Sequence, residues 1–133
     1  MAKVWLITGS GNGLGRDIVE AVLATGDSVV AGARRTQELE PLVAQYGERV
    51  KPATLEVRDE AAAEAAVQSA VDTFGRLDVL VNNAGYGQFA PFEQLSAEDF
   101  KAVVDTCFYG VVYTTRAAIP RDRRRMRPQA FAS

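Results

Sequence analysis

The sequence predicts an α/β fold in which helices cover both faces of a parallel sheet, a doubly wound arrangement. Short apolar runs, typical of strands buried on both faces, alternate with longer segments whose apolar residues recur at helical spacing. The links between these segments are short, which favours parallel strands joined by helical crossovers. A glycine-rich segment, ITGSGNGLG at residues 7–15, lies between the first predicted strand and the first predicted helix.

The predicted strands are four apolar runs bounded by turn residues. They span residues 4–8, 27–33, 49–57 and 77–85. Pro52 lies within the third run and lacks the backbone N–H that a central strand needs. The third strand is therefore predicted at an edge of the sheet.

The predicted helices are the segments with apolar residues three or four positions apart. They span residues 14–25, 36–47, 59–75 and 96–119. Thr36 and Ser96 are the expected N-terminal caps, because their side-chain oxygens can accept hydrogen bonds from the first free N–H groups. Asp59 is expected near the start of the third helix. Pro41 inside the second segment predicts a kink or a late start of that helix.

Composition excludes several classes of protein. The 133 residues suffice for one domain, and 47% apolar with 24% charged residues is ordinary for a globular chain. No apolar run approaches the ~20 residues of a membrane span, so no membrane partner is expected. The single cysteine and the lack of a signal-peptide pattern predict a cytoplasmic location. There is no histidine and a single cysteine, Cys107, so neither a metal site nor an internal disulfide is predicted.

Charge divides the chain at about residue 120. Residues 121–133 carry five arginines and one aspartate, a local charge of +4, whereas residues 1–120 carry −6. The interpretation is a dinucleotide-binding domain over 1–120 and a basic, disordered tail over 121–133. Binding of nucleic acid by the tail is the alternative, and no nucleic-acid partner is expected.

The glycine-rich segment indicates a phosphate site. Glycines allow a pyrophosphate to approach the backbone, and the N-terminus of the following helix offers free N–H groups with a partial positive charge. A second strand ends about 20 residues later, as in dinucleotide-binding units. These three features together favour a dinucleotide over a simple turn.

Two motifs carry a resemblance to a known family. The glycine segment has the pattern T-G-x-x-x-G-x-G from Thr8 to Gly15, and NNAG follows the fourth strand at residues 82–85. With the long helix that ends in AAIP, the chain resembles the short-chain dehydrogenase/reductase family over residues 3–120. The resemblance implies an incomplete Rossmann-like sheet of four strands in the order 3-2-1-4. It also implies hydride transfer between a nicotinamide nucleotide and an alcohol or carbonyl.

The resemblance implies a set of cofactor-binding residues. The pyrophosphate would lie against Thr8, Gly9, Asn12, Gly13, Leu14 and Gly15. Asn83, Ala84 and Gly85 would lie on the adenosine and ribose side, and Glu56 and Val57 near the adenine. Glu56 departs from the family, which usually has aspartate there. For Asn82 and Asn83, a purely structural role in which the two amides tie loops together stays open.

The end of the second strand indicates the type of nucleotide. An acid at this point binds the ribose 2′-OH and repels a 2′-phosphate. Here Ala33 is followed by Arg34 and Arg35, and guanidinium groups pair well with phosphate oxygens. NADP(H) is therefore preferred, with Arg34 as the main contact, and NAD(H) is the alternative. Asn12 adds no second positive charge from the glycine turn.

The family's catalytic residues are missing from this chain. The family uses a serine and a tyrosine four residues before a lysine, but Lys3, Lys51 and Lys101 each lack such a tyrosine. Cys107 replaces a family asparagine and is predicted as a small buried side chain without a catalytic role. The chain is therefore interpreted as an oxidoreductase half, inactive alone. The alternatives are a non-catalytic NADP(H)-binding or interaction fragment, or a frameshifted product.

An exposed edge is also predicted. The fourth strand, at residues 77–85, would lose the neighbour that later strands supply in the family. In the family, the helix that corresponds to residues 100–119 commonly forms part of a subunit interface. Long apolar edges promote association, so self-association through these two segments is expected.

Overall fold

The computed structural model describes residues 2–85, 92–122 and 131–132. Four strands form the centre of a parallel sheet: β1 (Val4–Ile7), β2 (Ser28–Ala33), β3 (Val50–Thr54) and β4 (Val79–Val81). Their order is β3-β2-β1-β4, as predicted, and the central strand β1 aligns Leu6 with Val30 of β2 and Leu80 of β4. The chain therefore reverses its direction of winding between β1 and β4, and a crevice forms at such a point.

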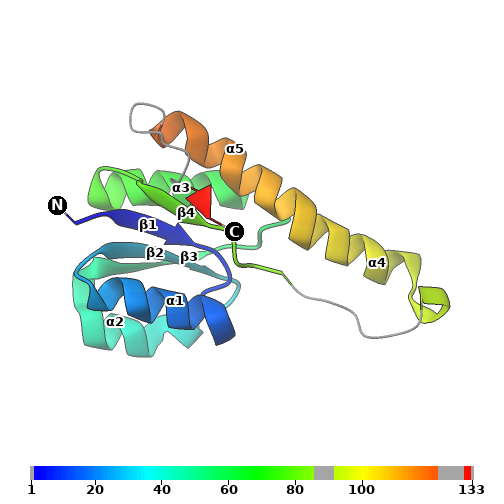
Figure 1. Ribbon diagram of the computed structural model, residues 1–133, viewed down its shortest axis with the longest axis horizontal. Helices are drawn as coiled ribbons and strands as arrows, with labels where there is room; N and C mark the ends of the chain where they lie inside the picture. Colours follow the sequence, from blue (N-terminus) through cyan, green and yellow to red (C-terminus); the bar gives the residue numbers. More distant parts are fainter. Residues whose placement is uncertain (1, 86–91, 123–130, 133) are drawn as a thin grey trace.

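Helices lie on both faces of this sheet (Figure 1). One face is covered by α1 (Gly13–Ala24) and α2 (Glu40–Tyr46), and the other by α3 (Glu60–Phe74) and α5 (Gly110–Asp122). Each layer has its own core, because successive side chains of a strand point to opposite faces. Leu6 and Val30 pack under α3, whereas Ile7, Val29 and Ala31 pack under α1 and α2. This two-sided burial explains the continuous apolar runs.

A fifth strand extends the sheet beyond the predicted four. Phe131–Ala132 forms β5, which pairs in parallel with β4 at Leu80 and Val81. The prediction that the outer edge of β4 is unpaired is therefore wrong at these two residues. Residues 123–130 of the predicted tail lie outside the described residues, and self-association stays a prediction.

Helix boundaries follow local sequence signals with one exception, at Thr36. Asp59 caps α3 by accepting hydrogen bonds from the backbone N–H groups of Ala61 and Ala62, and Gly75 ends the helix with a φ of 81°. The predicted cap at Thr36 is wrong, because a 3₁₀ helix over Thr36–Leu39 precedes α2. The late start of α2 is confirmed, since its first turn contains Pro41.

Strands β3 and β4 are shorter than predicted. Pro52 lies in the edge strand β3, as expected, but the strand ends at Thr54, three residues before the predicted end. Before β4, Asp78 accepts a hydrogen bond from the backbone N–H of Val4 at 2.9 Å and pairs with Arg76 at 2.7 Å. This polar side chain fixes the start of the strand.

The long C-terminal helix contains a wide turn. The helix α4 (Ala97–Val104), capped by Ser96, continues into a π-helical turn over Asp105–Tyr109 and then into α5. The helix passes very close to the segment after β3, because a Cβ at Gly110 would lie only 2.7 Å from Cγ2 of Val57. This close approach brings the π-helical turn to the carboxyl edge of the sheet. In the described part of the chain, none of the helices has the length and apolar character needed to span a membrane.

Candidate functional site

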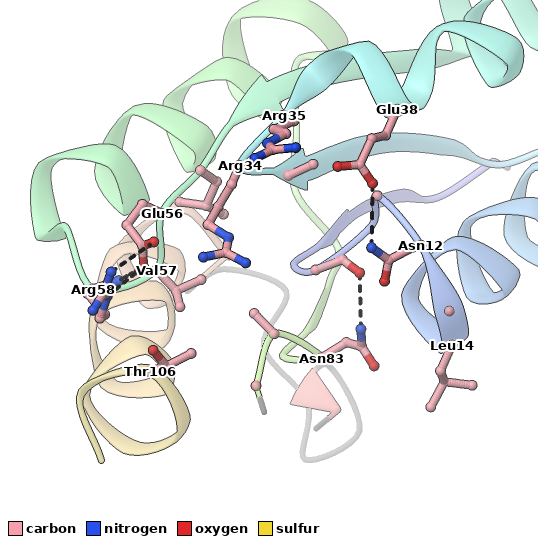
Figure 2. A pocket seen from close by; sticks show the side chains of 17 residues that line it. Asn12, Leu14, Arg34, Arg35, Glu38, Glu56, Val57, Arg58, Asn83 and Thr106 are labelled. Carbon is pink, nitrogen blue, oxygen red and sulfur yellow. Dashed lines mark hydrogen bonds and ion pairs between the residues drawn. The ribbon is translucent and has the colours of Figure 1, made fainter. Parts of the chain in front are cut away.

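A cavity of about 960 Å³ lies at the carboxyl ends of the strands (Figure 2). Its lining comes from the glycine turn, the end of β2 with the following 3₁₀ helix, the segment after β3, the segment after β4, and the π-helical turn. The lining residues are Gly9, Gly11, Asn12, Gly13, Leu14, Ala33, Arg34, Arg35, Glu38, Leu55, Glu56, Val57, Arg58, Asn83, Ala84, Gly85 and Thr106. The volume is in the range of pockets that hold small ligands and cofactors.

The glycines of the turn have two different roles. Gly9 and Gly13 have φ values of 66° and 59°, which favour glycine. Gly13 has no heavy atom within 4 Å of an added Cβ, so its backbone is open to the cavity. At Gly15 an added Cβ would lie 1.9 Å from the carbonyl oxygen of Gly9. Gly13 therefore permits ligand approach, whereas Gly15 permits the turn to close on α1.

The turn presents the N-terminus of α1 to the cavity. The helix begins at Gly13, and Asn12 before it is extended and makes no side-chain cap. The first N–H groups of a helix have no partner within the helix. Here no capping side chain covers them, so they can donate to an anion that lies in the cavity.

Thr8 and Asn83 join the turn to the end of β4. The hydroxyl of Thr8 accepts hydrogen bonds from the backbone N–H groups of Asn83 at 3.0 Å and Ala84 at 2.9 Å. The side-chain amide of Asn83 donates to the carbonyl of Gly9 at 3.2 Å. Thr8 is only 1% exposed and does not line the cavity. Thr8 and Gly15 are thus positioning residues behind the cavity wall.

Asn82 connects β4 with α5. Its Oδ1 accepts a hydrogen bond from the hydroxyl of Thr114 at 2.5 Å, and its Nδ2 donates to Thr115 at 3.4 Å. Asn82 does not line the cavity. Its contacts match the structural role that the sequence left open.

Glu56 forms an ion pair at the cavity wall. Its carboxylate accepts hydrogen bonds from the side chain and the backbone of Arg58 at 3.0 Å and 3.1 Å. Partial burial raises the pKa of Glu56, but the hydrogen bonds and charge of Arg58, together with the charge of Arg34, outweigh burial and lower that pKa. Glu56 is therefore ionised at neutral pH.

The structure brings most of the predicted residues together, and it adds six that were not predicted for the site. Eleven of the thirteen predicted residues line the cavity, all except Thr8 and Gly15. The six additional lining residues are Gly11, Ala33, Glu38, Leu55, Arg58 and Thr106. A signal existed for Gly11, which lies inside the quoted glycine segment. Among the described lining residues there is no tyrosine or lysine.

Cys107 differs from its prediction. The sequence predicted a buried side chain, but Cys107 is exposed on the π-helical turn. Its sulfur lies 3.3 Å from the place where a Cβ on Gly85 would be. The wide turn displaces side chains from the regular helical faces, which explains the exposure.

Comparisons with known proteins agree with this geometry. The family model described as short chain dehydrogenase matches residues 3–127. The chain is 47% identical over 121 residues to Oxidoreductase BOA17 of Botryotinia fuckeliana, covering 90% of this chain and 44% of that protein. It is 38% identical over 116 residues to NADP-dependent 3-hydroxy acid dehydrogenase YdfG of Salmonella typhi. This match covers 86% of this chain and 47% of that protein.

Solved structures give the same result. A short-chain dehydrogenase from Streptomyces avermitilis superposes with a TM-score of 0.89 at 40% identity, covering 94% of this chain and 46% of that one. A 3-ketoacyl-(acyl-carrier-protein) reductase from Brucella melitensis, complexed with NADH, superposes with a TM-score of 0.87 at 33% identity. This match covers 92% of this chain and 51% of that one. The chain thus spans about half the length of the relatives it matches. From its motifs, its fold and these matches, the chain belongs to the short-chain dehydrogenase family.

Proposed function

We propose that this chain binds NADP(H) in the cavity at the carboxyl edge of the sheet and forms the nucleotide-holding half of an oxidoreductase. The observation that carries the proposal is the open glycine turn. Gly13 leaves its backbone free of neighbours where α1 begins. This turn lies between β1 and the crevice beside β4, where α/β sheets bind their ligands.

The residues of the cavity fit a dinucleotide. The pyrophosphate lies against Gly9 and Gly13, where the N–H groups of α1 stabilise its charge. Asn83, held to Gly9 by its amide, and the following Ala84 and Gly85 support the adenosine and ribose side. The wall formed by Glu56 and Val57 receives the adenine. When bound, the nicotinamide supplies or accepts the hydride.

Two arginines favour the phosphorylated nucleotide. Arg34 and Arg35 are exposed at the end of β2 and line the cavity, and Arg34 points into it (Figure 2). A guanidinium can form paired hydrogen bonds with a phosphate. Relatives include both an enzyme named as NADP-dependent and a structure complexed with NADH. The preference for NADP(H) in this chain therefore rests on the arginine pair.

Replacement of Arg34 tests this preference. Arg34→Asp is expected to weaken NADPH binding by about 1.5–3 kcal/mol, the range of charge-assisted hydrogen bonds, and to change NADH binding much less. Fluorescence titration with both nucleotides measures the difference. Arg116→Asp makes the same charge change at an exposed position outside the cavity and serves as the control. Equal losses for NADPH and NADH in Arg34→Asp would contradict the assignment.

Catalysis by this chain alone is not expected. A general acid within reach of the carbonyl accelerates proton transfer by about 10²–10⁴-fold, and none of the three lysines follows a tyrosine at the required offset. NADPH oxidation against a panel of aldehydes, ketones and quinones should therefore stay at background. Activity above background that disappears in Gly13→Trp would show that the chain has a catalytic group of its own.

A non-catalytic nucleotide-binding module is the second candidate. The absence of tyrosine and lysine from the described cavity lining favours it. Binding without turnover is its signature, and turnover excludes it.

A further inference from the structure

A carboxylate outside the predicted set of site residues lies beside the glycine turn. Glu38 is half-buried in the 3₁₀ helix over Thr36–Leu39 and lines the cavity. Its Oε2 accepts a hydrogen bond from Nδ2 of Asn12 at 3.4 Å. Figure 2 shows this side chain reaching from the wall that carries Arg35 toward the glycine turn.

The fold holds Glu38 in this place. The next residue, Leu39, is fully buried in the core under α1 and α2. Nη1 of Arg16 donates a hydrogen bond to the carbonyl oxygen of Glu38 at 2.7 Å, which ties the 3₁₀ helix to α1. A Cβ on Gly11 would lie 2.8 Å from Oε2, so the carboxylate lies close against this glycine.

The charge of Glu38 is not balanced by an ion pair. Within the described residues, its carboxylate has the neutral amide of Asn12 as its partner and no salt bridge. Glu56, the other carboxylate of the cavity lining, is paired with Arg58. Glu38 therefore contributes a negative charge to the cavity that Arg34 and Arg35 also line.

We propose that Glu38 is a specificity-determining residue that reduces the preference for NADP(H) created by the two arginines. The end of β2 is where the 2′-substituent of the adenosine ribose is recognised, and Glu38 lies four residues beyond Arg34, facing Asn12. A carboxylate there accepts a hydrogen bond from a 2′-hydroxyl and repels a 2′-phosphate. The site accordingly accepts both nucleotides. This inference rests on the proposed function.

The test is Glu38→Gln, titrated with NADP⁺ and NAD⁺. Glutamine keeps the length of the side chain and an oxygen that accepts from Asn12, so the change removes the charge alone. We expect NADP⁺ to bind about 3–10-fold more tightly, because a like charge near the phosphate is lost, and NAD⁺ to bind equally or slightly less tightly. In about 1 M salt, where the Debye length is about 3 Å, this increase in NADP⁺ affinity should become smaller.

The control is Glu48→Gln. Glu48 is exposed and precedes the amino end of β3, whereas the cavity lies at the carboxyl ends of the strands. This variant therefore changes the net charge without touching the cavity. It should leave the ratio of NADP⁺ to NAD⁺ affinity unchanged.

The outcomes separate the two proposals. If the folded wild-type chain binds neither nucleotide, the proposed function fails and this inference fails with it. If wild type binds NADP⁺ and Glu38→Gln shifts both nucleotides by the same factor, or weakens NADP⁺, this inference alone is overturned. A ratio that moves toward NADP⁺ in Glu38→Gln but not in Glu48→Gln supports it.

Discussion

Gly15→Ala is expected to destabilise the chain by about 3 kcal/mol and to remove nucleotide binding. Alanine is favoured over glycine inside a helix by about 1 kcal/mol, so the substitution would stabilise the chain if space for the methyl group were available. At Gly15 the new Cβ would instead lie 1.9 Å from the carbonyl oxygen of Gly9 and 2.5 Å from Nδ2 of Asn83. Backbone must move, and overpacking of this kind costs about 1–3 kcal/mol or more.

Gly13→Ala is the matched control for this prediction. No heavy atom lies within 4 Å of its added Cβ, so the cost is limited to a φ of 59° that alanine adopts with difficulty, about 1–2 kcal/mol. Urea denaturation of both variants gives the comparison. If Gly15→Ala were as stable as wild type, the tight approach of α1 to the turn would be refuted.

Thr8→Val is expected to cost about 2–4 kcal/mol, because two backbone N–H groups lose their acceptor. Valine has nearly the shape of threonine but lacks the hydroxyl that receives the N–H groups of Asn83 and Ala84. The segment after β4 would then lose its connection to the glycine turn. Weaker nucleotide binding should accompany the loss of stability.

Thr8→Ser separates the contribution of the hydroxyl to stability from that of the methyl group. Serine keeps both hydrogen bonds and removes one buried methyl, which costs about 1 kcal/mol. In chemical denaturation, wild type should be the most stable, Thr8→Ser the next and Thr8→Val the least stable. The reverse order of the two variants would mean that packing of the methyl, not the hydrogen bonds, fixes the segment.

Much of the fold was predictable because local signals agree with the tertiary structure. Apolar runs buried on both faces define β1 and β2, and the edge position of β3 follows from Pro52. Sequence did not predict β5, because a two-residue strand has no periodicity to detect. The π-helical turn was also missed, since its extra residue does not interrupt the apolar spacing enough to mark a boundary.

The candidate site was predicted where short motifs carry it. The glycine turn and the segment after β4 have recognisable patterns, and their residues meet at the cavity. Glu38 lies in the first turn of a 3₁₀ helix and Thr106 in the π-helical turn, and both were missed because the placement of these segments depends on packing. Arg58 was missed because its role is to pair with Glu56, which only the fold of the turn after β3 reveals.

Isothermal titration calorimetry measures whether this chain binds a nicotinamide dinucleotide at the open glycine turn. The 133-residue chain, shown by circular dichroism to be folded, is titrated with NADP⁺ beside Gly13→Trp, whose side chain would fill the space over the turn. We expect saturable 1:1 binding of NADP⁺ to wild type, competed by 2′,5′-ADP, and no binding to folded Gly13→Trp. Absence of saturable binding to the folded wild-type chain, or equal binding to Gly13→Trp, would contradict it.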